Sequence, residues 1–468
     1  MKRLKTFHHD GVVHPLVLGI PLTIACFIQD RATFFRFVVA TRVVEPTGPL
    51  EHFFTLAQRY KLGLLWPELH LTPDVLNSIE HLTYVLRFYP VVSIECNVDL
   101  AWLACYVNPN TPLSWSWFPS FAWEPSCLDH WFTAWSTGFR ITSIGWHSDN
   151  LAIDAFAAVV RHLRHLKHID VVIDVCPTHF LVNLFALAAT STTLKSIMLE
   201  DEGGHAVSGQ MLQHATTWLE RCPVTMFRFH RWDWSTTVAP GIVTAFVRAL
   251  FRHPTLQLLH IEQCNLVRVP VLSMGGPLFP ALWQLHFESV YAPADTAAWL
   301  PMVLFHSPIH ELILPNVVCS ASAHIRILRA LKFSHLNELD LTGWSLAPIW
   351  GIAVSCLSTA LVRQLTLTDP GDGINDDSLA GIAQIIATNE TLTHVTVRVS
   401  HTTTAMVALM SAMMDREASL ECLCLVGVER VQHSEADATM LAELAADHQV
   451  ELSGELGSIC RLQITPLE

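Results

Sequence analysis

Large apolar residues recur along the chain in a fixed frame, at the first, fourth and sixth positions of a six-residue segment. The clearest copy is Leu256-Gln257-Leu258-Leu259-His260-Ile261. Eleven such frames begin at Ile141, Leu166, Leu194, Val224, Leu256, Leu282, Ile309, Leu336, Val362, Leu392 and Leu420, with 25 to 32 residues from one start to the next. Apolar and polar positions alternate within each frame, which predicts a strand with one buried face.

The rest of each period has room for a helix. Apolar residues from Ile242 to Phe251 have helical spacing, and a second such run follows Asp376-Asp377. A strand and a helix repeating about every 28 residues resemble the leucine-rich repeat of the ribonuclease-inhibitor class. This resemblance implies an α/β solenoid of strand-helix repeats, with a parallel sheet on its concave face. Cys264 fits the Asn/Cys position of that repeat, whereas Trp232 and Trp344 replace it, so we expect differently shaped turns there.

The chain before Ile141 has a different pattern from the repeats. The sequence as a whole therefore predicts four segments. Residues 1–60 are expected to form a short helical module, and residues 61–140 an N-terminal cap with an insertion. Residues 141–448 are expected to form the leucine-rich-repeat solenoid and residues 449–468 a C-terminal cap, with a last helix over Glu435 to His448. Asp74 is expected to cap a helix that runs through Leu86, and Val91 to Cys96 to form a degenerate repeat strand.

The insertion, Asn108 to Cys127, contains four prolines together with Trp115, Trp117 and Trp123. The prolines exclude a regular helix through it. One interpretation is an aromatic binding loop, because Trp is favoured at interaction hot spots. We favour the other, a cap that seals the end of the solenoid core.

Composition narrows the class of protein. Hydrophobic residues make up 51% of the chain and charged residues 15%, which excludes a disordered chain. The net charge of −14 argues against nucleic-acid binding and favours a basic partner. The 12 Cys form no C-x-x-C pair, which favours free thiols and the cytoplasm, or the nucleus as the alternative. The apolar run Leu16 to Ile28 is too short for a membrane span and lacks a cleavage site, so we expect neither anchor nor signal peptide.

The frame also predicts which polar residues share the open face of the sheet. Equivalent positions of neighbouring parallel strands lie about 4.8 Å apart. Ten polar side chains are therefore expected to form one concave-face binding patch: Glu200, Arg228, His230, His260, Glu262, His286, Glu288, Glu311, Glu338 and Asp340.

Three uses compete for this patch. His260, His286, Glu262 and Glu288 have donors suited to a metal, and His260 with Glu288 suits acid/base chemistry. We favour the third use, recognition of Lys or Arg on a partner protein, with a solvated face of no specific role as the alternative. The sequence contains no phosphate, dinucleotide or zinc-protease motif. We therefore expect no enzyme activity, no metal and no cofactor.

Residues 16–40 resemble the F-box, a helical motif that docks on the Skp-type adaptor of cullin ubiquitin ligases. The apolar anchors of that motif match Ile24, Phe27, Ile28, Phe34 and Phe37. The chain departs from the motif at Leu16-Val17, where the family has Leu-Pro, and at Gly19, where it has Glu.

A short helical module ahead of these repeats matches the F-box/leucine-rich-repeat class. The resemblance implies a non-catalytic subunit that presents a bound protein for ubiquitylation. A leucine-rich scaffold or sensor without a ubiquitin link is the alternative. A docking module would leave some of Phe27, Ile28, Phe34 and Phe37 exposed, whereas a cap would bury all four.

Overall fold

The computed structural model separates the chain into two compact units, Met1–Ile173 and Asp174–Glu468. The division falls at residue 173. The residues that the structure describes are 24–25, 27–42, 48–120, 122–147, 153–173, 178–201, 203–234, 238–265, 279–290, 299–368, 376–399, 403–414, 416, 420–427, 439, 443, 450–453 and 461–466.

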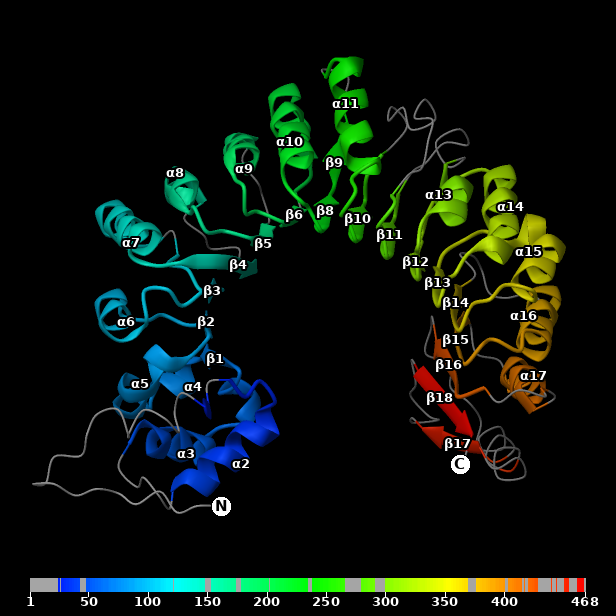
Figure 1. The fold of residues 1–468 in the computed structure, drawn as a ribbon. Helices are drawn as coiled ribbons and strands as arrows, with labels where there is room; N and C mark the ends of the chain where they lie inside the picture. Colours follow the sequence, from blue (N-terminus) through cyan, green and yellow to red (C-terminus); the bar gives the residue numbers. More distant parts are fainter. Residues whose placement is uncertain are drawn as a thin grey trace, which may run out of the picture. The chain divides into compact units, whose positions relative to one another are not determined.

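The first unit alternates short helices with short strands (Figure 1). Its elements are α2 (Arg31–Arg42), α3 (Pro49–Arg59), η1 (Leu62–Leu64), β1 (Glu68–Leu71), α4 (Pro73–Leu76), α5 (Ile79–Val85), η2 (Leu86–Phe88), β2 (Val91–Ile94), α6 (Leu100–Tyr106), β3 (Leu113–Trp115), α7 (Pro125–Gly138), β4 (Ile141–His147), α8 (Ile153–Val159), η3 (Val160–His162) and β5 (His168–Ile173).

These strands pair in parallel in the order β1-β2-β3-β4-β5. The strand-and-helix pattern thus begins at Glu68, well before the first clear frame at Ile141. The expected degenerate strand is β2, and the Trp/Pro-rich segment contains β3. The expectation of an insertion is therefore wrong, because this segment contributes an ordinary strand to the parallel sheet.

One tryptophan of this segment packs with two tryptophans of α7 in the core of the first unit. Trp115 on β3 is fully buried. Its ring centroid lies 6.0 Å from those of Trp131 and Trp135 on α7. Large aromatic rings bury much apolar area per residue, so they let a repeat with short elements build a core.

The N-terminal helices match the sequence only in part. Asp30 caps α2 as expected, since its Oδ1 accepts a hydrogen bond of 2.7 Å from the Thr33 amide. The helix expected after Asp74 is instead split into α4 and α5, and Thr72 rather than Asp74 caps α4. The earlier apolar run from Leu16 lies largely outside the described residues.

The second unit repeats a strand and a helix more regularly. Its elements are α9 (Thr178–Thr190), β6 (Ser196–Asp201), β7 (His205–Ala206), α10 (Gly209–Arg221), β8 (Met226–His230), β9 (Trp232–Asp233), α11 (Pro240–Phe251), β10 (Leu258–Glu262), β11 (Gln284–Glu288), α13 (Leu300–His306), β12 (Glu311–Ile313), α14 (Ala321–Ala330), η5 (Leu331–Phe333), β13 (Glu338–Leu341), η6 (Ala347–Ile349), α15 (Trp350–Leu357), β14 (Gln364–Thr368), α16 (Asp376–Thr388), β15 (His394–Val399), α17 (Thr403–Met414), β16 (Cys422–Gly427), β17 (Val450–Ser453) and β18 (Arg461–Pro466).

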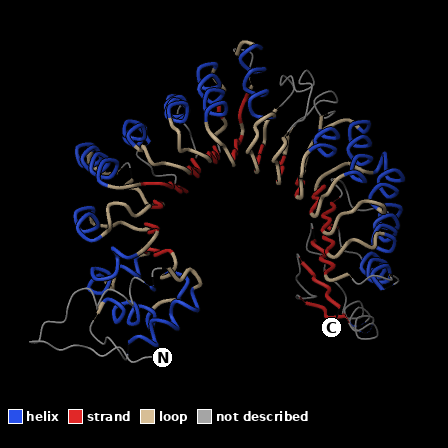
Figure 2. Tube along the Cα trace, viewed as in Figure 1, coloured by secondary structure: helices blue, strands red, loops and turns tan. Residues whose placement is uncertain are grey.

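The main sheet of the second unit is parallel from β6 through β16, and its helices cover one face (Figure 2). The expected frame is confirmed: Leu259 pairs with Leu285 and both are fully buried, while His260 pairs with His286 on the opposite, open face. At the C-terminal end β18 pairs antiparallel with β16, and β17 pairs antiparallel with β18. The helix expected over Glu435 to His448 lies almost wholly outside the described residues.

The turns after four successive central strands share one backbone geometry. Arg231, Gln263, Ser289 and Asn316 occupy the same place after successive strands, all with φ between 49° and 55°. Their amides donate to the carbonyls of Glu262, Glu288, Pro315 and Thr342 in the next repeat, at 2.6 to 2.9 Å. These turns are thus joined by backbone contacts. The turn before Cys264 has the same backbone conformation as the turn before Trp232, so the expectation of a differently shaped turn at Trp232 is wrong.

In one repeat a tryptophan side chain also joins neighbouring repeats by a hydrogen bond. The buried Trp344 indole donates a hydrogen bond of 2.8 Å to the Leu314 carbonyl of the preceding repeat.

The described part of the chain contains no helix that is long and apolar enough to cross a membrane.

Candidate functional site

Four neighbouring strands of the second unit, β6, β8, β10 and β11, bring most of the predicted patch together. Strand pairing places Arg228 beside His260 and His260 beside His286, and it places Glu262 beside both His230 and Glu288. The period-two alternation of each strand sends these side chains to the face opposite the buried leucines. The sequence prediction that these residues are neighbours is confirmed.

Arg228 bridges two of the carboxylates within the protein itself. Its Nη2 atom lies 2.8 Å from Oε2 of Glu200 and 2.6 Å from Oε2 of Glu262. Glu262 is buried at 8% exposure, and the other two side chains are largely covered. Charge-assisted contacts of this length are strong, but they use the charges of all three residues.

Two members of the predicted surface are therefore not available to a partner. Glu262 is buried and already paired, and His230 is only 3% exposed, with its Nε2 3.9 Å from Oε1 of Glu262. The sequence frame placed both on the open face. It did not reveal that neighbouring side chains, Arg228 among them, would cover that face at this point.

His260 and His286 stack face to face, with ring centroids 3.7 Å apart and planes 14° from parallel. Their Nε2 atoms lie 3.6 Å from Glu262 Oε2 and 3.3 Å from Glu288 Oε2, respectively. Burial, reinforced by the neighbouring His286 and Arg228, lowers the pKa of His260 to about 2. Burial lowers the pKa of His286 to about 4, although Glu262 acts in the opposite direction. Both imidazoles are therefore neutral near pH 7, and neither contact with a carboxylate is an ion pair at that pH.

A second group of carboxylates continues along the face without a cation. Glu311 pairs with Glu338 across β12 and β13, and Ile313 pairs with Asp340. Burial and then the neighbouring Glu338 raise the pKa of Glu311, while burial and then Asp340 raise that of Glu338. Among the described residues, no Lys or Arg side chain lies within ion-pair distance of either glutamate.

Glu288 belongs electrostatically to both groups. Burial raises its pKa most, and the nearby carboxylates of Glu262, Asp340 and Glu200 raise it further, while Arg228 acts in the opposite direction. The Asp340 carboxylate also has a structural contact, since its Oδ1 accepts a hydrogen bond of 2.8 Å from the Thr342 amide. Glu288, Glu311, Glu338 and Asp340 are called the acidic row below.

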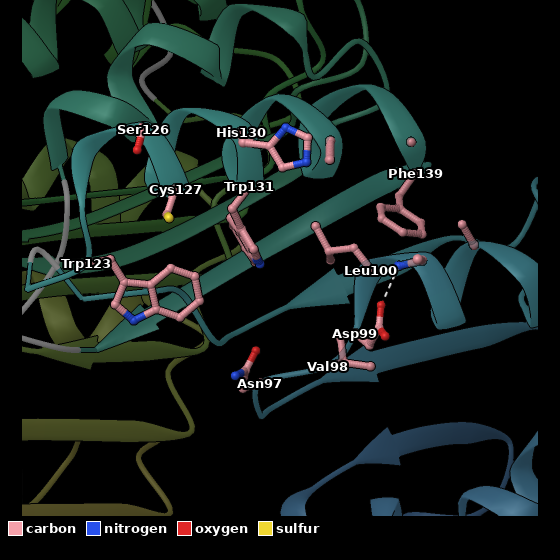
Figure 3. Close-up of a pocket in the computed structure, with 14 residues that line it drawn as sticks. Asn97, Val98, Asp99, Leu100, Trp123, Ser126, Cys127, His130, Trp131 and Phe139 are labelled. Atoms are coloured by element: carbon pink, nitrogen blue, oxygen red, sulfur yellow. Dashed lines mark hydrogen bonds between the residues drawn. The ribbon is translucent and has the colours of Figure 1, made fainter.

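A separate cavity of about 850 Å³ lies in the first unit, lined by residues of α6 and α7 and of the segments before them (Figure 3). Trp123 and Trp131 line it beside the polar side chains of Asp99 and His130. The Asp99 carboxylate caps α6, accepting from the amides of Ala101 and Trp102 at 2.8 and 3.2 Å. The Oδ1 atom of Asp99 is thus bonded to the start of α6, and the lining of the cavity is mainly apolar.

The residues that resemble F-box anchors divide into two groups. Phe27 is 82% exposed and Ile24 is 49% exposed, while Ile28 and Phe37 are half-buried. Phe34 is 1% exposed and stacks on Trp66 with ring centroids 3.9 Å apart. The assignment of Phe34 as a partner contact is therefore corrected: it is a core residue of the first unit. The burial of all four side chains expected of a cap is not observed either.

No Ser, Thr or Cys hydroxyl or thiol is hydrogen-bonded to His260 or His286 within the part of the chain that the structure describes. The expected patch thus contains two parts. In one, Arg228 is paired with Glu200 and Glu262, and the other is the acidic row. Comparison with models of known protein families gives no match, and comparison with curated proteins gives no significant similarity.

Proposed function

We propose that the chain is a non-catalytic, leucine-rich-repeat recognition protein whose second unit binds a basic segment of a partner protein along the acidic row. The observation that carries this proposal is the cross-strand placement of Glu311 and Glu338, with Asp340 beside them, and with no Lys or Arg paired to either glutamate among the described residues. Repeats of this kind bind partners on the sheet face in many proteins of this architecture.

The electrostatics support a cationic ligand. Carboxylates whose pKa values are raised by burial and by each other are less stable as anions than isolated glutamates. A Lys or Arg side chain placed between them would offset that cost, so binding energy is available there. By contrast, Glu200 and Glu262 already have Arg228, so an incoming cation would have to displace it.

A peptide titration tests this proposal. We expect an oligolysine peptide to bind the full chain at low ionic strength, and an oligoglutamate peptide of equal length not to bind. The double variant Glu311→Gln/Glu338→Gln should weaken oligolysine binding roughly tenfold or more, since rim charges mainly change the association rate and its salt dependence.

The matched control removes the same charge elsewhere. Glu124 and Glu220 are both exposed. Glu124→Gln/Glu220→Gln should leave the affinity within about twofold. Equal losses in the two double variants would mean that only net charge matters, and the acidic row would not be a binding site.

We also propose that the N-terminal module docks a Skp-type adaptor, which would make the chain a substrate-binding subunit of a cullin-type ubiquitin ligase. The exposure of Ile24 and Phe27 favours this role, because apolar side chains left in solvent next to each other mark interaction surfaces. The alternative is a scaffold or sensor with no ubiquitin link.

Capture of purified Skp-type adaptor distinguishes these two functions. We expect Ile24→Ala/Phe27→Ala to abolish capture with little change in melting temperature. Val39→Ala is the control, because Val39 is 54% exposed on the neighbouring helix α2 and carries no assigned contact. Failure of the wild-type chain to bind the adaptor would favour the scaffold role.

A further inference from the structure

Three side chains of β10 and β11 bring metal-binding atoms together on the open face of the second unit. His260 and His286 are cross-strand partners, and Glu288 follows two residues after His286 on the same side of β11. One donor atom of each lies within 4.8 Å of the other two. Two nitrogens and one carboxylate oxygen form a donor set that zinc proteins use.

The nitrogens that would bind the ion are otherwise unused. Nε2 of His260 and Nε2 of His286 are both shielded from solvent and have no hydrogen-bond partner within the described residues. The nearest carboxylate oxygens, at 3.6 and 3.3 Å, do not meet the geometry of a hydrogen bond. Covered polar atoms without a partner are unfavourable, and a cation shared by both lone pairs would satisfy them together.

The surrounding charges also favour a cation. The carboxylates of Glu200, Glu262 and Glu288 face a single guanidinium, that of Arg228. Arg228 holds the first two, so Glu288 remains available as a ligand. A divalent ion at His260, His286 and Glu288 would offset the remaining negative charge of this cluster.

We infer that His260, His286 and Glu288 form a site for one divalent transition-metal ion of the zinc class, with its remaining coordination position open to the sheet face. Nitrogen donors favour such ions over Mg²⁺ and Ca²⁺, which prefer oxygen ligands. The site would join two adjacent repeats through their side chains. It shares Glu288 with the acidic row but does not involve Glu311 or Glu338, and it revises the expectation that the patch holds no metal.

Binding requires a defined rearrangement. Zinc–nitrogen bonds are about 2.0–2.1 Å long, and the ion lies near the plane of each imidazole. Rings stacked at 14° cannot both point at one ion, so we expect them to turn about χ2 and lose the stack. The separation of the three donors must shrink by about 1 Å, which is within the reach of side-chain rotation.

Titration of the metal-free, full-length chain with Zn²⁺ alone tests the site by calorimetry. We expect one tight Zn²⁺ per chain, whose affinity falls at least roughly tenfold in His286→Asn and in Glu288→Gln, because each change removes a direct ligand. The chain has 26 His, so weak background binding is separated by a control, His394→Asn. His394 lies on the same sheet, at β15, and should leave the tight site unchanged.

No tight Zn²⁺ in the wild-type chain, or equal affinity in all three variants, would overturn the inference. Circular dichroism checks that each variant is folded. Should one fail to fold, Co²⁺ absorption of the wild-type chain decides. A four-coordinate spectrum without thiolate charge transfer supports the histidine-carboxylate site, and a thiolate band or a six-coordinate spectrum contradicts it.

Discussion

Glutamates of the same open face have opposite roles in two parts of the second unit, at two different positions of the repeat. On β6 and β10, Glu200 and Glu262 are covered and share the guanidinium of Arg228. On β12 and β13, Glu311 and Glu338 face each other across the strands with raised pKa values. The first pair is bridged by Arg228 and so links three strands. The second pair has no Arg or Lys partner among the described residues, so its charge can act on a bound partner. Residue type alone therefore does not identify a binding residue; the presence of an internal counter-ion distinguishes the two pairs.

Removing the counter-ion gives the largest expected effect. Arg228→Met should lower the free energy of unfolding by about 3–5 kcal/mol, because it leaves two covered carboxylates without a partner. Urea unfolding of the purified variants measures the loss. Arg363→Met, at an exposed arginine ahead of β14, should change stability by less than about 0.5 kcal/mol.

The same experiment has a rescue arm. The triple variant Arg228→Met/Glu200→Gln/Glu262→Gln should recover most of the stability, since a buried ion-pair network can often be replaced by uncharged residues at small cost. A triple variant as unstable as Arg228→Met would show that Arg228 acts through packing rather than charge.

The second prediction concerns Asp340, which contributes to both structure and charge. Asp340→Ala should lower stability by about 1–2 kcal/mol, because the Thr342 amide loses its acceptor. Asp340→Asn keeps an oxygen at that position and should retain most of that stability while still weakening oligolysine binding. If both variants are as stable as the wild type, the Asp340–Thr342 contact has no energetic role.

The smallest expected effect is the response of the acidic row to pH. A raised carboxyl pKa means that the folded chain binds protons more tightly than the unfolded chain, so stability falls as pH rises above the unfolded value near 4.5. Glu311→Gln/Glu338→Gln removes this loss. We expect the variant to be more stable than wild type by about 0.2–1 kcal/mol at pH 7, and the difference to vanish below pH 4.5. Thermal melts at both pH values measure it, and a variant less stable at pH 7 would refute the assigned repulsion.

Much of the second unit could be predicted because its pattern is periodic. The leucine frame set the alternation and register of successive strands, so the pairing of His260 with His286 and of Glu311 with Glu338 followed directly. Which side chains reach one another, however, depends on rotamers. The frame could not show that Arg228 bonds two glutamates, or that His230 is covered.

The elements of the first unit are harder to predict from the sequence, because many of its apolar residues are aromatic and irregularly spaced. Trp115 occupies a strand position but was taken for part of an insertion, since nearby prolines obscured the period. Phe34 has the spacing of an exposed anchor, and only tertiary contact with Trp66 buries it. Such contacts join residues more than thirty positions apart, which local patterns do not predict.

A second sequence motif marks buried polar residues ahead of the leucine frame. Before three frames, those at Leu194, Leu256 and Leu392, a polar residue, one further residue, Thr and Leu occur in the same order, and in the last two the polar residue is His253 or Asn389. Both side chains are buried and reach back to carbonyls of the preceding repeat: His253 Nε2 contacts Cys222 O at 3.0 Å, and Asn389 Nδ2 contacts Leu357 O at 2.7 Å. Their recurrence ahead of the frame is the signal that could have identified them as structural.

The left-handed turn residues have a consequence for how this protein can diverge. Arg231, Gln263, Ser289 and Asn316 differ in chemistry, yet they hold the same backbone conformation at the end of successive strands. That conformation costs on the order of 1–2 kcal/mol for L-residues with a side chain, so exchanging one unbranched side chain for another changes that cost little. Gln263, Ser289 and Asn316 are exposed beside the patch. Substitutions in this column can therefore change the chemistry that the face presents while the backbone beneath it keeps its conformation.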